Sequence, residues 1–268
     1  MRRCTTVARN RPAADVCRGG PNAVFRDSAV KAYHFVWLIW ASLFLIPWSA
    51  LFIANPARRS VIWRTSLATA VTGVAEPLFV PAYWNPPSLF DLAQRTGFDI
   101  ESIIFAFAVG GIGAVLYNTV TRRTLASVPG SNRSRRRHGL HRAALLTPYA
   151  VFVPLYLLPW NPIYAAIASL FIGAAAAALC RPDLARKAVI GGMLFLGLYG
   201  AFMLGLQIFA PGYIAQVWKL SALSGVLVDG IPLEELLFGF SFGMYWTGIY
   251  EHFTWRRTTH LTSVPIRW

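Results

Sequence analysis

The sequence predicts an all-α membrane protein, a polytopic helix bundle with about seven transmembrane helices. It is 56% hydrophobic and only 13% charged, with a mean hydropathy of +0.48, which is typical of an integral membrane protein rather than a soluble domain. Apolar runs long enough to span roughly 30 Å of hydrocarbon follow one another along the chain. These runs cover residues 33–54, 65–83, 99–120, 143–159, 162–180, 188–210 and 232–253.

An internal repeat divides these runs into two halves. Residues 97–117 align with residues 230–250 without a gap, and the identical pairs are Gly97/Gly230, Glu101/Glu234, Phe105/Phe238, Phe107/Phe240, Gly110/Gly243 and Tyr117/Tyr250. Because a repeat indicates architecture more strongly than a single motif, we expect two parallel three-helix repeats joined by a linking helix. The expected division is a disordered basic tail at 1–32, a first unit at 33–123, a basic loop and linking helix at 124–161, a second unit at 162–257 and a C-terminal tail at 258–268.

The net charge of +14 indicates an orientation in the membrane rather than a nucleic-acid partner. Sixteen Lys and Arg residues fall in the C-terminal segment and in the loops at 55–64, 121–142 and 181–187, whereas the opposite loops hold only Arg95 and Lys219. By the positive-inside rule the basic side is cytoplasmic, so we expect a multi-pass protein of the cell (inner) membrane. The N-terminal tail, with seven further basic residues, falls on the other side and disagrees with this bias.

The clearest candidate site is the start of the last apolar run. Pro232 suits the first helical position, where a missing N–H group has no cost. Glu234 and Glu235 follow in the first turn, at the positive end of the helix dipole. Carboxyl groups at the mouth of a membrane helix are costly and therefore indicate function. Adjacent helical side chains point about 100° apart, so we expect one glutamate in a cavity and the other outside it.

An aromatic, proline-rich segment follows the second apolar run. It begins at Glu76 and includes Tyr83 and Trp84, and the Pro86-Pro87 pair excludes a continuous helix there. Trp218 belongs to a thinner counterpart in the second half. We expect this segment to lie along the membrane interface, beside the acids.

These features resemble the lycopene cyclase domain, the family of membrane-embedded carotenoid cyclases of heterodimeric and fused types. The motifs behind the resemblance are Glu76-Pro, Tyr83-Trp84-x-Pro86, the Glu101 helix and Pro232-x-Glu234-Glu235. The resemblance covers roughly residues 33–257 and implies cofactor-independent cyclisation of the ends of a linear, lycopene-like carotenoid into ionone rings within the lipid bilayer. Association with a second copy or with another carotenoid enzyme stays open. The first half departs from the family pattern, because it has Asp99-Ile100-Glu101-Ser102 in place of Pro-x-Glu-Glu.

Such a reaction needs an acid and surroundings that tolerate a cation. A proton reaches a double bond, the next double bond attacks the carbocation, and a proton leaves, so we expect no redox cofactor and no metal; the sequence has no dinucleotide fingerprint. Burial raises the pKa of a carboxyl group, and aromatic faces stabilise a cation. The candidate catalytic residues are Glu234, as the proton donor, with Glu235, Glu101 and Glu76. The candidate substrate-binding residues are Tyr83, Trp84, Phe105, Trp218, Phe238, Phe242 and Tyr245.

Ordinary structural roles fit some of these residues as well. Glu101 can simply cap its helix, the tyrosine–tryptophan pair can anchor in the interfacial aromatic belt, and the phenylalanines can pack in the core or face lipid. Glu251 and His252, at the far end of the last run, are expected to be solvated. Cys180 is expected only to pack, because the three cysteines show no metal-binding spacing.

Two functions of other classes stay open. One is a non-catalytic carotenoid-binding or assembly subunit, and the other is a proton-coupled carrier, which also combines parallel repeats with intramembrane acids. A carrier would hold its acids near the bilayer midplane, whereas these acids head helices, which favours the enzyme. A membrane prenyltransferase would need paired Asp-rich motifs, and a retinal protein would need a lysine in the last helix; neither is present.

Overall fold

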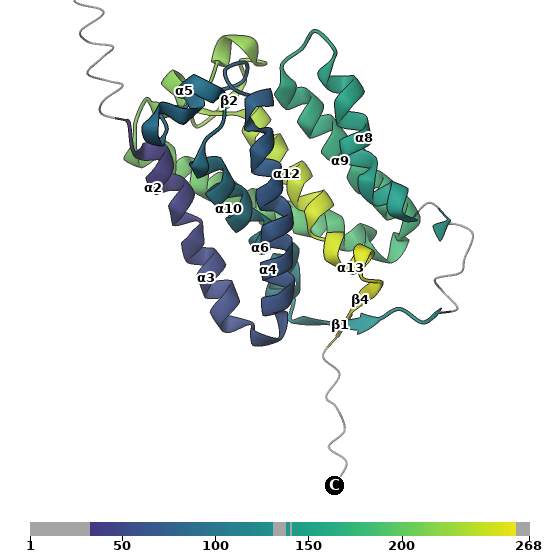
Figure 1. Cartoon of the computed structure of the whole chain (residues 1–268). Helices are drawn as coiled ribbons and strands as arrows, with labels where there is room; N and C mark the ends of the chain where they lie inside the picture. The colour runs from purple at the N-terminus through teal and green to yellow at the C-terminus, as the bar shows by residue number, and fades with distance from the viewer. Residues whose placement is uncertain (1–32, 131–137, 140, 261–268) are drawn as a thin grey trace, which may run out of the picture.

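The computed structural model describes residues 33–130, 138–139 and 141–260, and these residues are mostly helical (Figure 1). The predicted tail at 1–32 and most of the tail at 258–268 lie outside this part. Four helical segments are long and apolar enough to cross a membrane. They are α2 with α3 (Val36–Leu43 and Leu45–Ala54), α6 (Ile100–Val120), α9 (Pro162–Cys180), and η5 with α10 (Pro182–Leu184 and Ala185–Phe209).

Shorter helices occupy the other three predicted runs, and their crossing of a membrane stays a prediction. They are α4 (Arg59–Ala70), which continues as the 3-10 helix η2 (Val71–Leu78), α8 (His141–Tyr156), and α12 (Leu233–Trp246) followed by α13 (Ile249–Phe253). The predicted loop at 55–64 is wrong in part, because η1 (Pro56–Arg58) and α4 begin inside it. Pro56 favours this early start, since proline suits the first helical positions.

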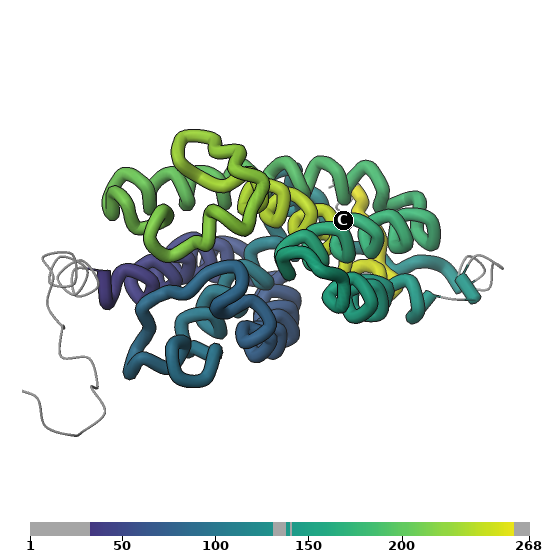
Figure 2. Tube along the Cα trace, turned by 90° about the horizontal axis from the view of Figure 1, so that it is seen from above, coloured from purple at the N-terminus to yellow at the C-terminus, as the bar shows by residue number. Residues whose placement is uncertain are grey.

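Three helix pairings are the most extensive in the bundle. They join α4 to α6, α10 to α12, and α8, at the predicted linking helix, to α9. Viewed from above, the purple and blue N-terminal helices group together, with the green and yellow helices beside them (Figure 2). Glycines permit two of these approaches: a Cβ atom at Gly110 of α6 would lie 1.9 Å from Thr69 Oγ1 in α4, and one at Gly243 of α12 would lie 2.6 Å from Phe195 Cβ in α10.

Two small antiparallel sheets modify the expectation of an all-α chain. Strand β1 (Arg123–Ser127) pairs with β4 (Arg256–His260), and β2 (Leu227–Val228) pairs with β3 (Ile231–Pro232). The first sheet joins the chain after α6 to the chain after α13, so the ends of the two repeat helices are tied together. The described connections also contain η3 (Leu89–Asp91), α5 (Leu92–Thr96), α11 (Tyr213–Val217) and η6 (Leu220–Ala222).

Aligned positions of the repeat share unusual backbone conformations. Gly97 and Gly230 have φ values of 75° and 82°, in the left-handed region that glycine enters at little cost. At the other end of the two helices, Arg122 and Trp255 have φ values of 51° and 54°. The two repeat helices are therefore preceded and followed by residues with the same left-handed backbone conformation.

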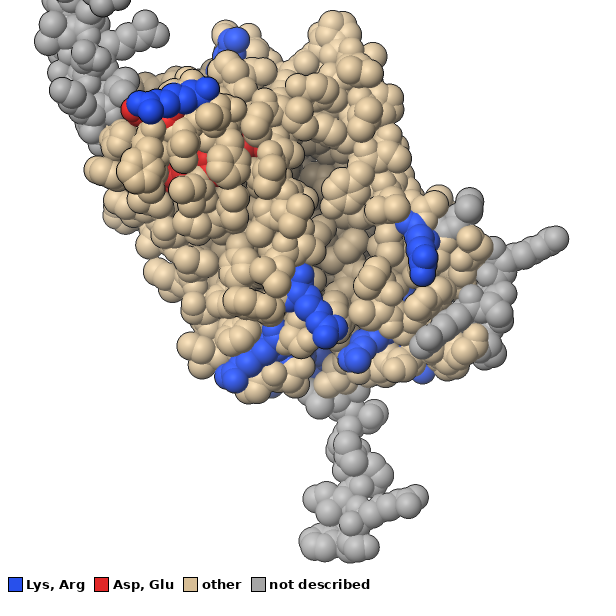
Figure 3. Space-filling view, in the orientation of Figure 1, with Lys and Arg blue, Asp and Glu red and all other residues tan. Residues whose placement is uncertain are grey.

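The charged side chains are segregated along the molecule. Most of the Lys and Arg visible in Figure 3 lie at the end that holds β1 and β4, and the visible acidic groups lie towards the opposite end, near α5. Glu251 and His252 sit at the basic end but are not solvated as expected, since each is only 1% exposed. Glu251 is buried because Lys187 forms an ion pair with it and Asn118 donates a hydrogen bond of 2.8 Å to its Oε1.

Candidate functional site

A cavity of about 300 Å³ lies among α6, α8, α9, α10, α12 and the η2 segment. Its walls are almost entirely apolar and aromatic, as in many sites for small apolar ligands. In Figure 3 the surface is hollowed between the part that holds α4 and the part that holds α8, and both η2 and α8 contribute to the lining. The opening therefore lies on the side of the bundle, between helices.

Nine of the eleven residues proposed from the sequence line this cavity. Two of them are acids, and the other seven are aromatic. They are Glu76, Tyr83, Trp84, Phe105, Trp218, Glu235, Phe238, Phe242 and Tyr245.

Of the four proposed acids, Glu235 accepts the most side-chain hydrogen bonds. Its Oε1 accepts hydrogen bonds from the Tyr83 hydroxyl and, at 2.7 Å, from Trp218 Nε1, while its Oε2 is hydrogen-bonded by the Tyr199 hydroxyl. Glu235 is 4% exposed, and Tyr83, Tyr199 and Trp218 are each 5% exposed. Three donors from three separate segments thus fix a single buried carboxyl group on the cavity wall.

Glu76 is the second acid on the wall, and it accepts a hydrogen bond from Trp84 Nε1. The backbone of Trp84 forms an antiparallel bridge with that of Trp218, and their indole rings lie 5.2 Å apart. Asn85 N donates to Val217 O at 2.9 Å, which extends the same pairing. One loop from each half therefore supplies an indole donor, Trp84 to Glu76 and Trp218 to Glu235. Tyr83 and Trp84 are buried, so they belong to the interior rather than to an interfacial belt.

Glu234 and Glu101 do not line the cavity, although both are buried. Glu234 Oε1 accepts hydrogen bonds of 2.8 Å from the Tyr164 hydroxyl and from the backbone N–H group of Ser224. Glu101 Oε1 accepts one of 2.7 Å from the N–H group of Leu89. The two aligned glutamates therefore each hold the loop that precedes their own helix.

The position after each aligned glutamate does face the cavity. Ser102 follows Glu101 in the first half, and Glu235 follows Glu234 in the second half. Both Ser102 and Glu235 line the cavity. The two helix starts differ in their caps: the Asp99 side chain accepts the Ser102 N–H group, whereas Pro232 at the N-cap of α12 forms no such bond. The two halves thus present one hydroxyl and one carboxyl group at matching places.

Aromatic rings form the walls around the acids. Phe238, Phe242 and Trp246 stack along α12, with centroid separations of 6.1 and 5.7 Å. Phe105, which also lines the cavity, packs against Trp37 at 5.6 Å and Tyr199 at 6.2 Å. Aromatic rings around a cavity can stabilise a cation formed inside it.

Two further contacts hold the wall of α12 in place. Trp246 Nε1 donates a 2.9 Å hydrogen bond to the carbonyl of Gly110 in α6, and the Tyr245 hydroxyl donates to the carbonyl of Leu145 in α8. Outside the apolar helices, Tyr213 in α11 is fully buried, and burial raises the pKa of its hydroxyl, with a further contribution from nearby Asp99 and Glu101. The hydrogen bonds of Trp246 and Tyr245 therefore hold α12 against α6 and α8.

Sequence reasoning missed Tyr199, Tyr164 and Ser102 as parts of this arrangement. A tyrosine in the middle of an apolar run was the available signal for Tyr199, because a buried phenol needs a hydrogen-bond partner. Ser102 could have been found by reading the repeat one position beyond its identical residues. Tyr164 gave no such signal, since it follows a helix start that looks like an interfacial anchor.

Residues 161–253 match the family model described as lycopene cyclase. The match covers most of the second predicted unit and none of the first, whereas the resemblance read from the sequence extended over both. No curated protein matches the chain. No solved structure matches it either.

Proposed function

From the lycopene cyclase match over residues 161–253 and the two acids on one aromatic cavity, we propose that the chain is a membrane enzyme that cyclises the ends of linear carotenoids. The observation that supports this most is Glu235, a buried carboxyl group held on an apolar wall by three donors. A binding pocket for a hydrocarbon alone has no need of a carboxyl group. A cyclase needs one to deliver a proton.

In this proposal Glu235 protonates the terminal double bond of the polyene. A carbocation forms, the neighbouring double bond attacks it and closes a six-membered ring, and the new cation loses an adjacent proton. One proton enters and one leaves, so the reaction is an isomerisation with no change in oxidation state. In the same proposal Glu76, which also lines the cavity, takes the departing proton.

The contacts of Glu235 suit a proton donor. The indole of Trp218 can only donate, so it occupies Oε1 whatever the protonation state. The Tyr199 hydroxyl at Oε2 can donate or accept. A proton on Oε2 therefore keeps a partner before transfer, and the remaining carboxylate keeps one afterwards.

The size and opening of the cavity fit one end of a long substrate. A volume of about 300 Å³ is at the lower limit for ligand sites, which suits an end group rather than a whole carotenoid. The opening between η2 and α8 would let the rest of the carotenoid lie in the lipid.

The shared backbone conformations at Gly97/Gly230 and Arg122/Trp255 support an architecture of two parallel units. With seven spans, the acids would lie on the side away from the cytoplasm.

The test is to add unlabelled lycopene to membranes that contain the chain, in buffered heavy water, and to analyse the pigments by chromatography and mass spectrometry. We expect cyclic carotenoids with one deuterium in each new ring, since the donated proton exchanges with solvent through the carboxyl group. Rings without deuterium would contradict protonation by a carboxyl group. Lycopene that is bound by the purified protein but never cyclised would instead support a binding subunit.

A further inference from the structure

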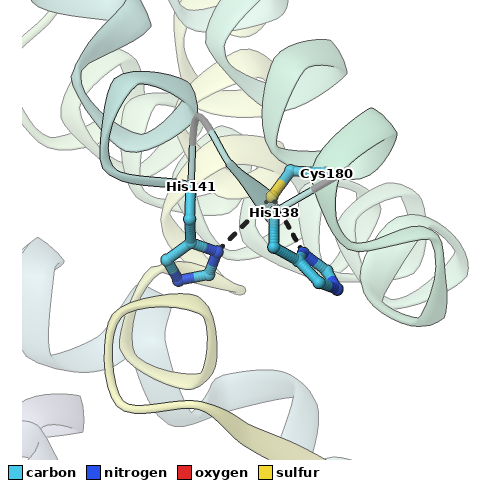
Figure 4. A group of neighbouring side chains, drawn as sticks. All are labelled: His138, His141 and Cys180. Atoms are coloured by element: carbon cyan, nitrogen blue, oxygen red, sulfur yellow. Dashed lines mark hydrogen bonds between the residues drawn. The ribbon is translucent and has the colours of Figure 1, made fainter. Parts of the chain in front are cut away.

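A second cluster of reactive side chains lies at the basic end, far from the acids of the cavity. His138, His141 and Cys180 are 9%, 8% and 6% exposed, and their ligand atoms all lie within 4.8 Å of one another (Figure 4). They come from the segment before α8, the first residue of α8 and the last residue of α9. The cavity of the proposed reaction contains none of them.

The two nitrogen–sulfur separations in this cluster match those of a tetrahedral metal site, and the third separation, between the two histidines, is at most 4.8 Å. The Nδ1 atoms of His138 and His141 each lie 3.4 Å from Cys180 Sγ, and both rings turn this atom towards the sulfur (Figure 4). Zinc–sulfur and zinc–nitrogen bonds of about 2.3 and 2.0–2.1 Å at a tetrahedral angle give a separation of about 3.6 Å between the two ligand atoms. The observed separations are within a few tenths of an ångström of that value.

The surroundings of His141 support the role of a ligand. Its Nε2 is 2.9 Å from the carbonyl oxygen of His252, which can only accept, so Nε2 carries the proton and Nδ1 presents a lone pair to Cys180. Histidines that bind metals commonly donate their other N–H group to a backbone carbonyl in this way. The ring of Trp255 stacks on His141 at 3.9 Å and fixes its plane.

His252 supplies a further, independent observation. It is 1% exposed, its ring lies 4.2 Å from that of His141, and neither of its ring nitrogens has a hydrogen-bond partner in the described part of the chain. Buried polar groups are rarely left without a partner. His252 is thus a buried nitrogen donor without a partner beside the cluster, although it is not one of the three grouped residues.

One described cation beside the cluster is paired with an acid. Arg181 follows Cys180 directly, and its guanidinium is held by Asp183 at 2.6 Å and donates to the carbonyl of Arg256. Its charge is therefore partly compensated by Asp183.

We propose that His138, His141 and Cys180 bind one zinc ion. Two imidazoles and a thiolate are the donors that zinc prefers. The ion would join the segment before α8 to the end of α9, and through the His252 carbonyl and Trp255 it would hold the turn between α13 and β4. We assign it a structural role that closes the basic end of the bundle.

The test measures metal in the full-length protein, purified in detergent with a streptavidin-binding tag so that no histidine tag adds a site. After incubation with zinc and dialysis against metal-free buffer, we expect about one zinc per chain by mass spectrometry. Cys180→Ser should lower the retained zinc about ten-fold or more, since each ligand contributes directly to affinity. The control variants are His34→Gln and the double variant Cys4→Ser, Cys17→Ser, which should retain zinc as the wild type does.

A second measurement keeps the proposal testable if Cys180→Ser does not fold. In the Cys4→Ser, Cys17→Ser variant Cys180 is the only cysteine, so cobalt loading should produce a thiolate-to-cobalt charge-transfer band together with the strong visible bands of a tetrahedral ion. Absence of this band, or equal zinc in wild type and a folded Cys180→Ser, would overturn the proposal. Equal zinc in the two proteins would mean that any bound zinc is an adventitious ion only, and that the three side chains form a hydrogen-bonded cluster.

Discussion

Glu234 and Glu235 are neighbours on the first turn of α12, yet they face different surroundings. Glu235 lies on the cavity wall with Tyr83, Tyr199 and Trp218, whereas Glu234 accepts hydrogen bonds from Tyr164 and from the Ser224 backbone outside the lining. The separation of about 100° between adjacent helical positions is what divides them. Our proposal therefore gives the role of proton donor to Glu235, although the sequence alone favoured Glu234.

This division predicts different effects of two isosteric changes. Glu235→Gln removes the acidic proton while the amide oxygen still accepts from Trp218, so ring formation should fall by about 10²–10⁴-fold. Glu234→Gln keeps an oxygen acceptor for Tyr164 and Ser224, so activity should change by less than about ten-fold. Pigment analysis in a lycopene-accumulating host, normalised to the amount of protein in the membrane, checks both.

Glu101→Gln is the matched control from the first half, because Glu101 also holds a loop and does not line the cavity. It should behave as Glu234→Gln does. If Glu234→Gln abolished cyclisation while Glu235→Gln stayed active, the assignment of the donor would be wrong, even if the protein were still a cyclase.

A second prediction concerns the contact between α6 and α4. Alanine at Gly110 would place its Cβ 1.9 Å from Thr69 Oγ1 and 2.9 Å from the carbonyl oxygen of Thr65, so the helices must move apart. We expect a loss of about 1–3 kcal/mol, as for other overpacked sites, seen as a lower melting temperature in detergent. At Gly197 of α10 an added Cβ meets nothing within 4 Å, so Gly197→Ala should leave the melting temperature unchanged or raise it. Equal melting temperatures for the two variants would show that the close approach at Gly110 is not needed.

A third prediction concerns the buried ion pair of Lys187 and Glu251, whose side chains are 2% and 1% exposed. Glu251→Gln leaves the ammonium group buried without its counter-ion, and breaking such a pair costs about 3–5 kcal/mol. Adding Lys187→Met removes the unpaired charge, while the glutamine can still accept from Asn118. The double variant should therefore regain most of the lost thermal stability, and a double variant no more stable than Glu251→Gln would contradict this account.

A fourth prediction concerns orientation in the membrane. Asn85 is exposed at the acidic end, and Ser127 is exposed at the basic end in β1. In a Cys4→Ser, Cys17→Ser background, Asn85→Cys should react with a membrane-impermeant maleimide in intact cells, whereas Ser127→Cys should react only after permeabilisation. The reverse pattern would overturn the sixteen-to-two charge argument for a cytoplasmic basic side.

The helical class and nine of the residues that line the cavity could be predicted from the sequence alone. Apolar runs of spanning length identify α6, α9 and α10 within a few residues, since run length is a local property. The repeat, the helical spacing after Glu234 and the Tyr83–Trp84 segment identified nine residues that the fold brings to one cavity. These signals are local or repeat themselves, so no knowledge of helix packing was required to find them.

The tertiary structure decided which side of each helix meets which neighbour. A helix that is apolar on all sides carries no periodic signal for its buried face, so the choice between Glu234 and Glu235 depended on where Tyr199 and Trp218 were placed. The burial of Glu251 depended on Lys187, 64 residues away along the chain. The meeting of His138 with Cys180 spans 42 residues. Sequence spacing reports neighbours within one helix turn, whereas these contacts exist only after separate helices have packed together.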